Sequence, residues 1–250
     1  MKISIITATY NSEGFIMSNL NSVNSQTYKN YEHIIIDNES KDKTLDIIRN
    51  NGKGVKIISE KDEGIYDAFN KGIELATGDI ISILNSDDYY SDNKILENIV
   101  DIFKKKNVGI VYGNINYVKR YGEKKILRYW KSNKYKTNDF KIGWSPPHPA
   151  FFVKKSLYDQ YGKYKSIYGN SSDFELMYRF LEKNRLSNDY IDKTLVTMRL
   201  GGKSNKNLSE IIRQNLIILD ILDIKKNIYL ITKFFVNKFI NRIKQLIILK

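Results

Sequence analysis

Residues 65–88 read IYDAFNKGIELATGDIISILNSDD, and their pattern is the clearest indication of the fold class of the chain. Residues 65–76 repeat apolar side chains at helical spacing, and Thr77-Gly78 stands where glycine commonly ends a helix. Residues 79–84 then form a short apolar run, which favours a buried strand, and the polar turn 85–88 closes it. Helix, strand and polar turn in this order are typical of one unit of an α/β sheet.

The same alternation extends on both sides, across residues 1–115. Apolar runs predict further strands at Ile3–Ala8, Tyr31–Asp37, Val55–Ser59 and Val108–Tyr112. Helical spacing predicts helices around residues 15–23, 45–48 and 95–103 between them. We therefore expect an α/β protein with a Rossmann-like, mostly parallel sheet and helices on both faces.

The pattern changes after residue 115. Residues 119–141 are polar, aromatic and basic without a clean period, and a loop at 143–149 holds all three prolines of the chain. Beyond it the sequence predicts a strand at 151–153, helices near 156–161 and 173–182, and a late strand at 192–199. No Gly/Ser-rich linker divides the chain. We expect one domain, 1–210, in two halves, 1–115 and 116–210.

Residues 211–250 are expected to form a helical, basic, amphipathic tail. Residues 224–250 contain seven Lys or Arg and no acidic residue, with apolar side chains three to four positions apart. A basic amphipathic helix is typical of peripheral contact with an anionic membrane surface. Packing against the domain or a partner subunit is the alternative for this segment.

Composition limits the chemistry. The absence of cysteine excludes disulfides, thiolate metal sites and a cysteine nucleophile, and it fits a reducing compartment. The first residues lack the features of a secretory signal, and no uninterrupted apolar run approaches the length of a membrane span. The net charge of +13 favours polyanionic partners in general, although solvated lysines explain it equally well.

Polar residues follow three of the predicted strands. The first ends at residues 8–11 (ATYN), the second at Asp37-Asn38, and the fourth at Asp87-Asp88. Ligands of open α/β sheets bind at the carboxyl ends of the strands. Adjacent carboxylates repel each other unless a cation or hydrogen bonds offset the repulsion, and a hard divalent ion would also grip a diphosphate.

Seven motifs, in order, resemble family 2 glycosyltransferases of the GT-A fold, which build bacterial capsule, O-antigen or exopolysaccharide. They are SIITATYN (4–11), IIDNESKDKT (35–44), DEGIYDAFNKGIELATGD (62–79), NSDD (85–88), PHPAFF (147–152), SSDFELMYRF (171–180) and RLGGKS (199–204). They cover about residues 1–205 and leave the tail uncovered.

The resemblance implies a donor site for a nucleoside-diphosphate sugar, with a UDP-sugar expected. It implies these donor-side residues: Ala8, Tyr10, Asp37 and Asn38 around the nucleoside, Asp67 and Lys71 beside the diphosphate, Asp87 facing ribose or sugar, and Arg199, Gly202 and Ser204 in a closing loop. Asp88 would hold Mg²⁺ or Mn²⁺ against the diphosphate. The turn lacks a literal Asp-x-Asp, so one carboxylate would hold the ion, and Asp-Asn after the second strand leaves the nucleobase open.

The resemblance also implies inverting transfer to a hydroxyl of a glycan or lipid-linked acceptor in cell-surface polysaccharide synthesis. Asp173 matches the catalytic base, with Glu175 as the fallback, although Asp173 also suits the N-cap of the following helix. Trp144 and His148 are expected on the acceptor side. We expect a cytoplasmic enzyme, peripheral at the inner face of the cell membrane, without nucleic-acid partners.

The sequence is also compatible with other functional classes of protein. A basic nucleic-acid-binding protein would explain the charge, but the basic residues are spread and no common recognition module is legible. A sugar-phosphate nucleotidyltransferase would need a Gly-rich basic loop after the first strand, where residues 9–13 read TYNSE. An inactive relative and a homodimer are both left open.

Overall fold

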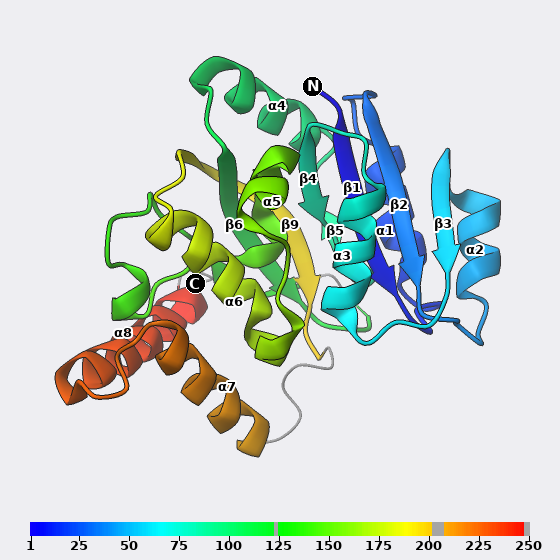
Figure 1. Cartoon of the computed structure of the whole chain (residues 1–250). Coiled ribbons are helices and arrows are strands. Elements are labelled where there is room, and N and C mark those ends of the chain that lie inside the picture. The colour runs from blue at the N-terminus through cyan, green and yellow to red at the C-terminus, as the bar shows by residue number, and fades with distance from the viewer. Residues whose placement is uncertain (123–124, 202–207, 248–250) are drawn as a thin grey trace.

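The computed structural model describes residues 1–122, 125–201 and 208–247, and in them one nine-stranded sheet forms the centre of the molecule (Figure 1). Its strands are β1 (Ile3–Thr9), β2 (Tyr31–Asp37), β3 (Val55–Ser59), β4 (Ile80–Ile83), β5 (Tyr89–Tyr90), β6 (Ile110–Val118), β7 (Ile126–Trp130), β8 (Phe151–Lys154) and β9 (Asn188–Arg199). Their order is β3-β2-β1-β4-β8-β6-β9-β5, with β7 beside β6.

Helices cover both faces of this sheet. They are α1 (Ile16–Asn24), α2 (Thr44–Asn51), α3 (Ile65–Leu75), α4 (Ile95–Lys106), α5 (Lys155–Tyr161), α6 (Ser172–Tyr178), α7 (Leu208–Ile221) and α8 (Ile228–Ile247). One face packs against α3, α5 and α6, and the other packs against α1, α2 and α4. The expected α/β architecture with two covered faces is confirmed.

Side chains alternate between the two faces along the central strands. Ile6 and Ile34 enter the core beneath α3, whereas Ile5 and Ile35, next to them in the chain, enter the cores on the opposite face. Because both faces are covered, these strands read as continuous apolar runs. Gly72 lets α3 approach closely, since a Cβ there would lie 2.3 Å from Ile6 Cγ2.

The sheet is parallel only in its first half. The pairs β1–β2, β2–β3 and β1–β4 are parallel, so their carboxyl ends meet at the lower edge in Figure 1. Beyond β4 the pairing is mixed: β8 runs antiparallel to β4 and β6, and β6 runs parallel to β9. Strand β7 lies in the stretch for which the sequence showed no period; its residues Arg128 and Trp130 line a cavity, and Trp130 also packs against the core.

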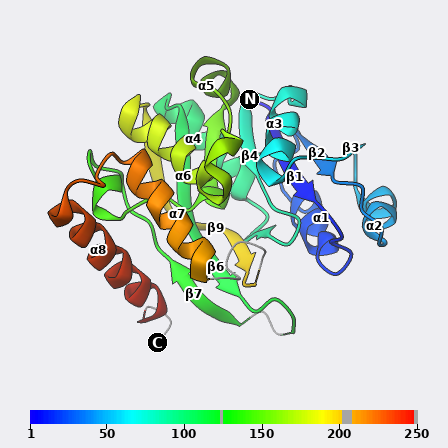
Figure 2. The same ribbon diagram turned by 60° about the horizontal axis from the view of Figure 1, so that its bottom comes forward.

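The tail forms two helices instead of one. The expected helix after residue 224 is α8, whereas α7 begins at Leu208, before the expected boundary at 211. Both lie on the side of β6, β7 and β9, away from β1 to β3 (Figure 2). Gly143 allows α8 to dock on the domain, since a Cβ there would lie 2.5 Å from the Phe234 carbonyl oxygen. Packing on the domain is thus confirmed for one face of α8, and none of the described helices is long and apolar enough to cross a membrane.

Candidate active site

A cavity of about 1180 Å³ opens at the carboxyl edge of the parallel strands. Its first wall consists of the loop after β1, the start of α3 and the turn after β4. Its second wall consists of β7, the loop at 143–145, the end of β9 and α8. Both halves of the domain and the tail therefore contribute to one site, which is the position expected for ligands of an open α/β sheet.

The acidic turn after β4 forms the floor of this cavity. Asp88 is 1% exposed, and its carboxylate accepts hydrogen bonds from Asn85 Nδ2 (2.9 Å) and the Arg199 amide (3.3 Å). Burial, followed by the charge of Asp87, raises the pKa of Asp88 well above its ordinary value. Asn19 of α1 holds the turn in place through hydrogen bonds to the carbonyls of Asn85 (2.9 Å) and Asp88 (3.3 Å).

One arginine pairs with the carboxylate of the neighbouring Asp87, and a second arginine binds the backbone of the same residue. Arg120 Nη1 lies 2.9 Å from Asp87 Oδ2, and the Arg199 guanidinium donates to the Asp87 carbonyl. The two guanidinium groups lie 4.2 Å (Arg120) and 5.6 Å (Arg199) from the centre of the Phe15 ring. Asp87 is thereby paired, while the buried charge of Asp88 keeps no cationic side chain of its own at ion-pair distance among the described residues.

The donor set fits a hard cation. Asn85 Oδ1 and Thr9 Oγ1 are buried oxygens at the cavity that have no hydrogen-bond partner, and both residues line it together with Asp88. An amide oxygen beside a carboxylate is a typical pair of ligands for Mg²⁺ or Mn²⁺. Over the described residues, however, no group of three or more acidic or histidine side chains gathers around one point. Further ligands of such an ion would come from a bound diphosphate or solvent.

Asp173 lies in the first turn of α6 and does not itself line the cavity, whereas Asn170, three positions earlier in the chain, does. Burial, and then the charge of Asp173, raises the pKa of Tyr66 well above its ordinary value. His148 Nε2 lies 2.6 Å from the Tyr164 hydroxyl, and burial lowers the pKa of His148 although the charge of Asp173 opposes that shift. The carboxylate therefore belongs to a cluster with two tyrosines and a neutral imidazole.

Comparison with known proteins identifies the family of the chain. The family model described as "Glycosyl transferase family 2" matches residues 4–162. The chain belongs to glycosyl transferase family 2. This membership confirms the predicted family and the GT-A expectation, and it favours a glycosyltransferase over the nucleotidyltransferase and nucleic-acid-binding alternatives.

Several proteins named as glycosyltransferases are similar to this chain in sequence. An uncharacterized glycosyltransferase of Rickettsia typhi is 31% identical over 220 residues, 82% of this chain and 66% of that protein. The UDP-Glc:alpha-D-GlcNAc-diphosphoundecaprenol beta-1,3-glucosyltransferase WfgD of Escherichia coli is 33% identical over 118 residues, 46% of each chain. The chain thus spans about half the length of this relative, and 34% of a Nostoc glycosyltransferase matched at 34% identity.

Solved structures share the fold. TarS 1–349 of S. aureus in complex with UDP-GlcNAc superposes with a TM-score of 0.69 at 18% identity, over 96% of this chain and 73% of that one. The mannosyltransferase PcManGT of Pyrobaculum calidifontis in complex with GDP-Man and Mn²⁺ superposes with a TM-score of 0.59 at 15% identity, over 94% and 73% of the two chains.

Some of the predicted donor residues of this family 2 protein line the cavity, namely Ala8, Tyr10, Asn38, Asp87, Asp88 and Arg199. Asp37 does not. Its carboxylate is fully buried and accepts hydrogen bonds from the Ser40 amide (3.0 Å) and from Ser59 Oγ (2.7 Å). It shapes the loop that carries Asn38, and its side chain does not line the cavity.

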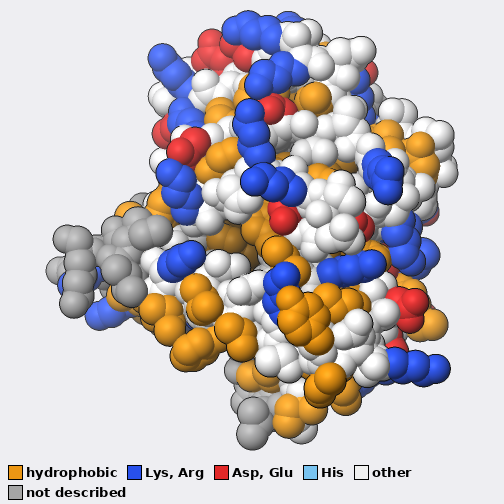
Figure 3. Space-filling model, turned by 90° about the vertical axis from the view of Figure 1, so that its left-hand side faces the viewer, with side chains coloured by type: hydrophobic (Ala, Val, Ile, Leu, Met, Phe, Trp, Pro, Cys, Tyr) orange, Lys and Arg blue, Asp and Glu red, His pale blue; other side chains and the backbone are white. Residues whose placement is uncertain are grey.

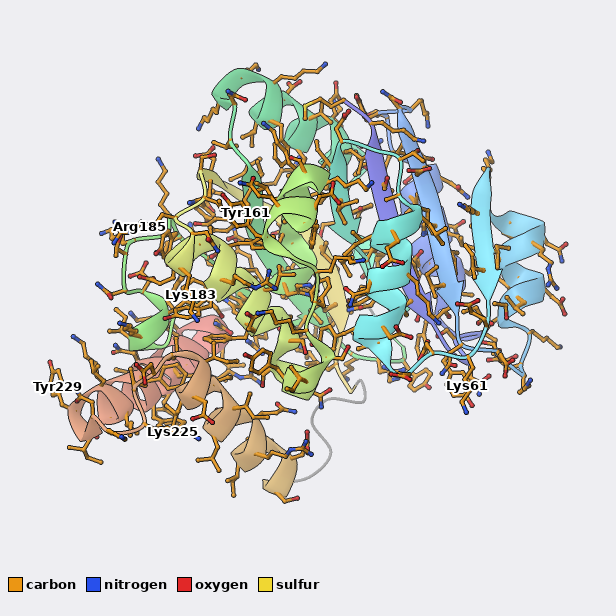
Figure 4. All side chains as sticks on the ribbon, in the orientation of Figure 1. Lys61, Tyr161, Lys183, Arg185, Lys225 and Tyr229 are labelled. Atoms are coloured by element: carbon orange, nitrogen blue, oxygen red, sulfur yellow. The ribbon has the colours of Figure 1, made fainter. Side chains whose placement is uncertain are left out.

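Asp67 and Lys71 also lie outside the cavity wall. Asp67 Oδ2 accepts from the Glu63 amide (3.1 Å), and Lys71 Nζ lies 2.9 Å from Glu60 Oε1 and donates to the Lys61 carbonyl (3.0 Å). Figure 4 shows Lys61 at the lower edge, on the loop between β3 and α3. These contacts hold the loop between β3 and α3 against α3, and neither side chain lines the cavity.

Two acceptor-side predictions need correction. Glu175 is buried in an ion pair with Arg179 (Oε1 to Nε 2.9 Å), and its other neighbour is Lys165 (3.4 Å), so it cannot serve as a fallback base. The helix begins at Ser172, so Asp173 lies in its first turn and is not its N-cap; its Oδ1 accepts from the Phe174 amide (2.7 Å). Trp144 does line the cavity, and its ring centre lies 5.6 Å from that of Phe140.

Several residues of the site were not predicted from the sequence. Arg120 and Arg128 line the cavity from the segment without a period, and Asn19 lies inside a helix as one polar residue among many. None of them carries a local signal, because their roles depend on partners far away in the chain. The predicted closing-loop residues Gly202 and Ser204 lie outside the described residues.

Proposed function

We propose that this protein is an inverting, metal-dependent glycosyltransferase that moves a sugar from a UDP-sugar to a hydroxyl of a glycan or lipid-linked acceptor. The observation that carries the proposal is the buried Asp88 carboxylate on the cavity floor, whose charge is raised in energy by burial and by Asp87. A buried carboxylate that lines a ligand cavity and has no ion-pair partner among the described residues suits a cation-bound diphosphate.

The donor side would use Asp88 with the Asn85 amide oxygen as ligands of Mg²⁺ or Mn²⁺. When bound, such an ion would stabilise the negative charge that develops on the leaving nucleoside diphosphate. Tyr10 and Asn38 would contact the nucleoside, since both line the same end of the cavity. Arg199 and Arg120 would keep Asp87 aligned beneath the sugar through the contacts described above.

The acceptor side would use Asp173 as the general base. Inversion needs one carboxylate that takes the acceptor proton on the face opposite the leaving group. Asp173 Oδ1 accepts a hydrogen bond from the Phe174 backbone amide of the same helix (2.7 Å), so Oδ2 is the oxygen that would accept the proton of the acceptor hydroxyl. His148, neutral because it is buried, would help to position the Tyr164 hydroxyl beside this carboxylate, and Trp144 would stack against a sugar ring.

The names of relatives support the substrate classes. WfgD of E. coli is named for UDP-glucose and for an acceptor linked to diphosphoundecaprenol. TarS was solved with UDP-GlcNAc, and PcManGT with GDP-Man and Mn²⁺. A role in cell-surface polysaccharide synthesis follows as part of the proposal, and residues 1–115 and 116–210 would act as donor and acceptor halves.

The tail would hold the enzyme at the inner face of the cell membrane. On α7 and α8, exposed apolar side chains include Ile212, Leu216, Tyr229, Val236 and Ile240. Figure 3 shows hydrophobic side chains gathered over the lower part of this face, with Lys and Arg beside them, and in Figure 4 Tyr229 and Lys225 lie at the outer end, away from the sheet. Such a surface suits an anionic lipid interface.

A thermal-shift screen tests the proposal. UDP should stabilise the whole chain only with Mn²⁺ or Mg²⁺ present, and GDP, CDP and ADP measured in parallel identify the nucleobase. Transfer is then followed by release of UDP from UDP-sugars in the presence of bacterial lipid-linked glycans. Stabilisation that ignores the metal, or no stabilisation by any nucleoside diphosphate, contradicts the proposal.

A further inference from the structure

The second wall of the cavity carries a group of positive charges, which we call the cationic wall. It consists of Arg128 on β7 and Lys238, Arg242 and Lys244 on α8. Lys131, also at the cavity, is paired with Asp192 at 2.8 Å. The four cationic-wall residues form none of the ion pairs found between described residues, so no carboxylate in the described part of the chain balances their charges.

Arg128 is the best buried of these groups, at 6% exposure. Its Nε donates to Gln245 Oε1 (2.5 Å), and its guanidinium lies 4.2 Å from the centre of the Tyr117 ring and 5.4 Å from that of Trp130. These partners are all neutral. Burial lowers the pKa of Arg128 to about 10, and Arg242 contributes in the same direction. The fold therefore keeps a guanidinium in a cavity wall without an anion, which costs free energy unless a ligand supplies one.

The neighbouring residues of α8 reinforce this charge. Lys238 Nζ donates to Asn215 Oδ1 (2.9 Å), another neutral group, and burial and Arg242 lower the pKa of Lys238. Like charges placed together on a cavity wall are destabilising in the free protein. Such an arrangement is typical of sites for phosphate groups, whose oxygens accept several charge-assisted hydrogen bonds.

The cationic wall and the acidic turn with Asp88 line the same cavity. Burial raises the pKa of Tyr117, the charges of Arg128 and Arg242 oppose that shift, and the charge of Asp88 adds to it, so both groups act on this hydroxyl. The cavity, at about 1180 Å³, exceeds the roughly 300–1,000 Å³ of sites that hold one small ligand. A donor diphosphate at Asp88 thus leaves room for a second anionic group. Phe235 and Phe239, on the same helix and also at the cavity, offer apolar contacts beside the charges.

We propose that Arg128, Lys238, Arg242 and Lys244 bind the phosphate or diphosphate of an anionic acceptor, so that β7 and α8 form the acceptor's phosphate subsite. This inference rests on the proposed glycosyltransferase function and specifies its acceptor class. The tail helix would then be part of the catalytic cavity as well as a surface element. A donor diphosphate is the other source of the same chemistry, and the experiment separates the two.

The test is isothermal titration of the whole chain with inorganic pyrophosphate, with and without saturating UDP and Mn²⁺. Arg242→Gln removes one charge from the cationic wall, and Lys233→Gln removes one charge from α8 at a position that does not line the cavity. We expect pyrophosphate to bind the UDP-saturated protein, Arg242→Gln to weaken that binding by about tenfold, and Lys233→Gln to leave it within about twofold.

The outcomes are distinct. If UDP saturation abolishes pyrophosphate binding, or if Arg242→Gln weakens UDP as much as pyrophosphate, the cationic wall serves the donor and the inference is overturned. Equal effects of the two substitutions reduce it to general surface charge and overturn it as well. If UDP does not bind while pyrophosphate still depends on Arg242, the phosphate subsite stands and the proposed donor chemistry fails.

Discussion

Asp88→Asn is the substitution that tests the donor site most directly, because it keeps the shape of the side chain and removes only its charge. The folded protein holds this carboxylate buried beside Asp87, and its two oxygens accept from Asn85 Nδ2 (2.9 Å) and from the Arg199 backbone amide (3.3 Å). An amide keeps one of the two oxygens, so one of these hydrogen bonds is lost at a cost of about 0.5–1.5 kcal/mol, whereas removal of the buried charge returns about 1–3 kcal/mol. We expect the ligand-free variant to be more stable by about 1 kcal/mol, or about 2–4 °C in Tm for a chain of this size.

The liganded protein should behave in the opposite way. UDP at 100 times its Kd, with Mn²⁺, stabilises the wild-type protein by about 2.7 kcal/mol, which is about 5–11 °C. If the substitution weakens UDP by about 100-fold, the same UDP concentration equals the new Kd and adds only about 0.4 kcal/mol. The variant thus melts above the wild-type protein without ligand and below it with ligand.

The dependence on pH supplies a second check of the same reasoning. Because the folded pKa of Asp88 is raised above its unfolded value, the folded state binds the proton more tightly. The penalty of the charge is therefore complete above the folded pKa and disappears as the pH falls through it. Differential scanning fluorimetry at several pH values should show the gap between variant and wild type closing on acidification. A variant that is less stable without ligand, or that keeps the full Mn²⁺-dependent shift, refutes the reasoning.

Four further predictions concern other parts of the molecule. Asp173→Asn should lower kcat by about 10²–10⁴-fold and leave the UDP thermal shift unchanged, because a general base acts on the acceptor only. Glu175→Gln should lower the free energy of unfolding in urea by about 3 kcal/mol, since it leaves the buried Arg179 cation unpaired. His33, whose pKa burial lowers to about 4, should stay neutral in an NMR titration until about pH 4, so that the unfolded chain takes up its proton first and stability falls below about pH 6.5. Ile240→Glu, on the exposed side of α8, should reduce flotation with anionic vesicles severalfold and leave UDP binding intact.

Each of these predictions has a control. Loss of UDP binding in the Asp173 variant would remove it from the role of base, and a Glu175 variant of unchanged stability would show that the ion pair contributes nothing. His148 is the only other histidine, so the two imidazole signals can be assigned by a single His148→Gln variant. Ile126→Glu places the same charge on an exposed apolar site of β7; equal loss of flotation in both variants would contradict a specific role of α8.

The parallel half of the sheet was predictable because its signals are local. Buried strands between two helical layers need continuous apolar runs, and Ile3–Ala8 and Tyr31–Asp37 show them within a few residues of their structural bounds. The strands of the mixed half of the sheet were harder to predict from the sequence. Strand β7 has one side on the cavity, so its sequence carries no alternation, and β5 is two residues long. The helix from Asp173 was expected to be continuous, but α6 ends at Tyr178 and a wider π turn follows.

The family, the α/β class and the acidic turn were predictable from short motifs, because few residue types are suitable at those positions. Which polar residues line the cavity, in contrast, depends on contacts between distant parts of the chain. Asp37 and Glu175 stand in the expected motifs, yet their carboxylates bind Ser40, Ser59 and Arg179, because a buried charge takes whatever partners the fold places beside it. Arg128 has no motif at all and reaches the site because β7 and α8, more than a hundred residues apart, meet there.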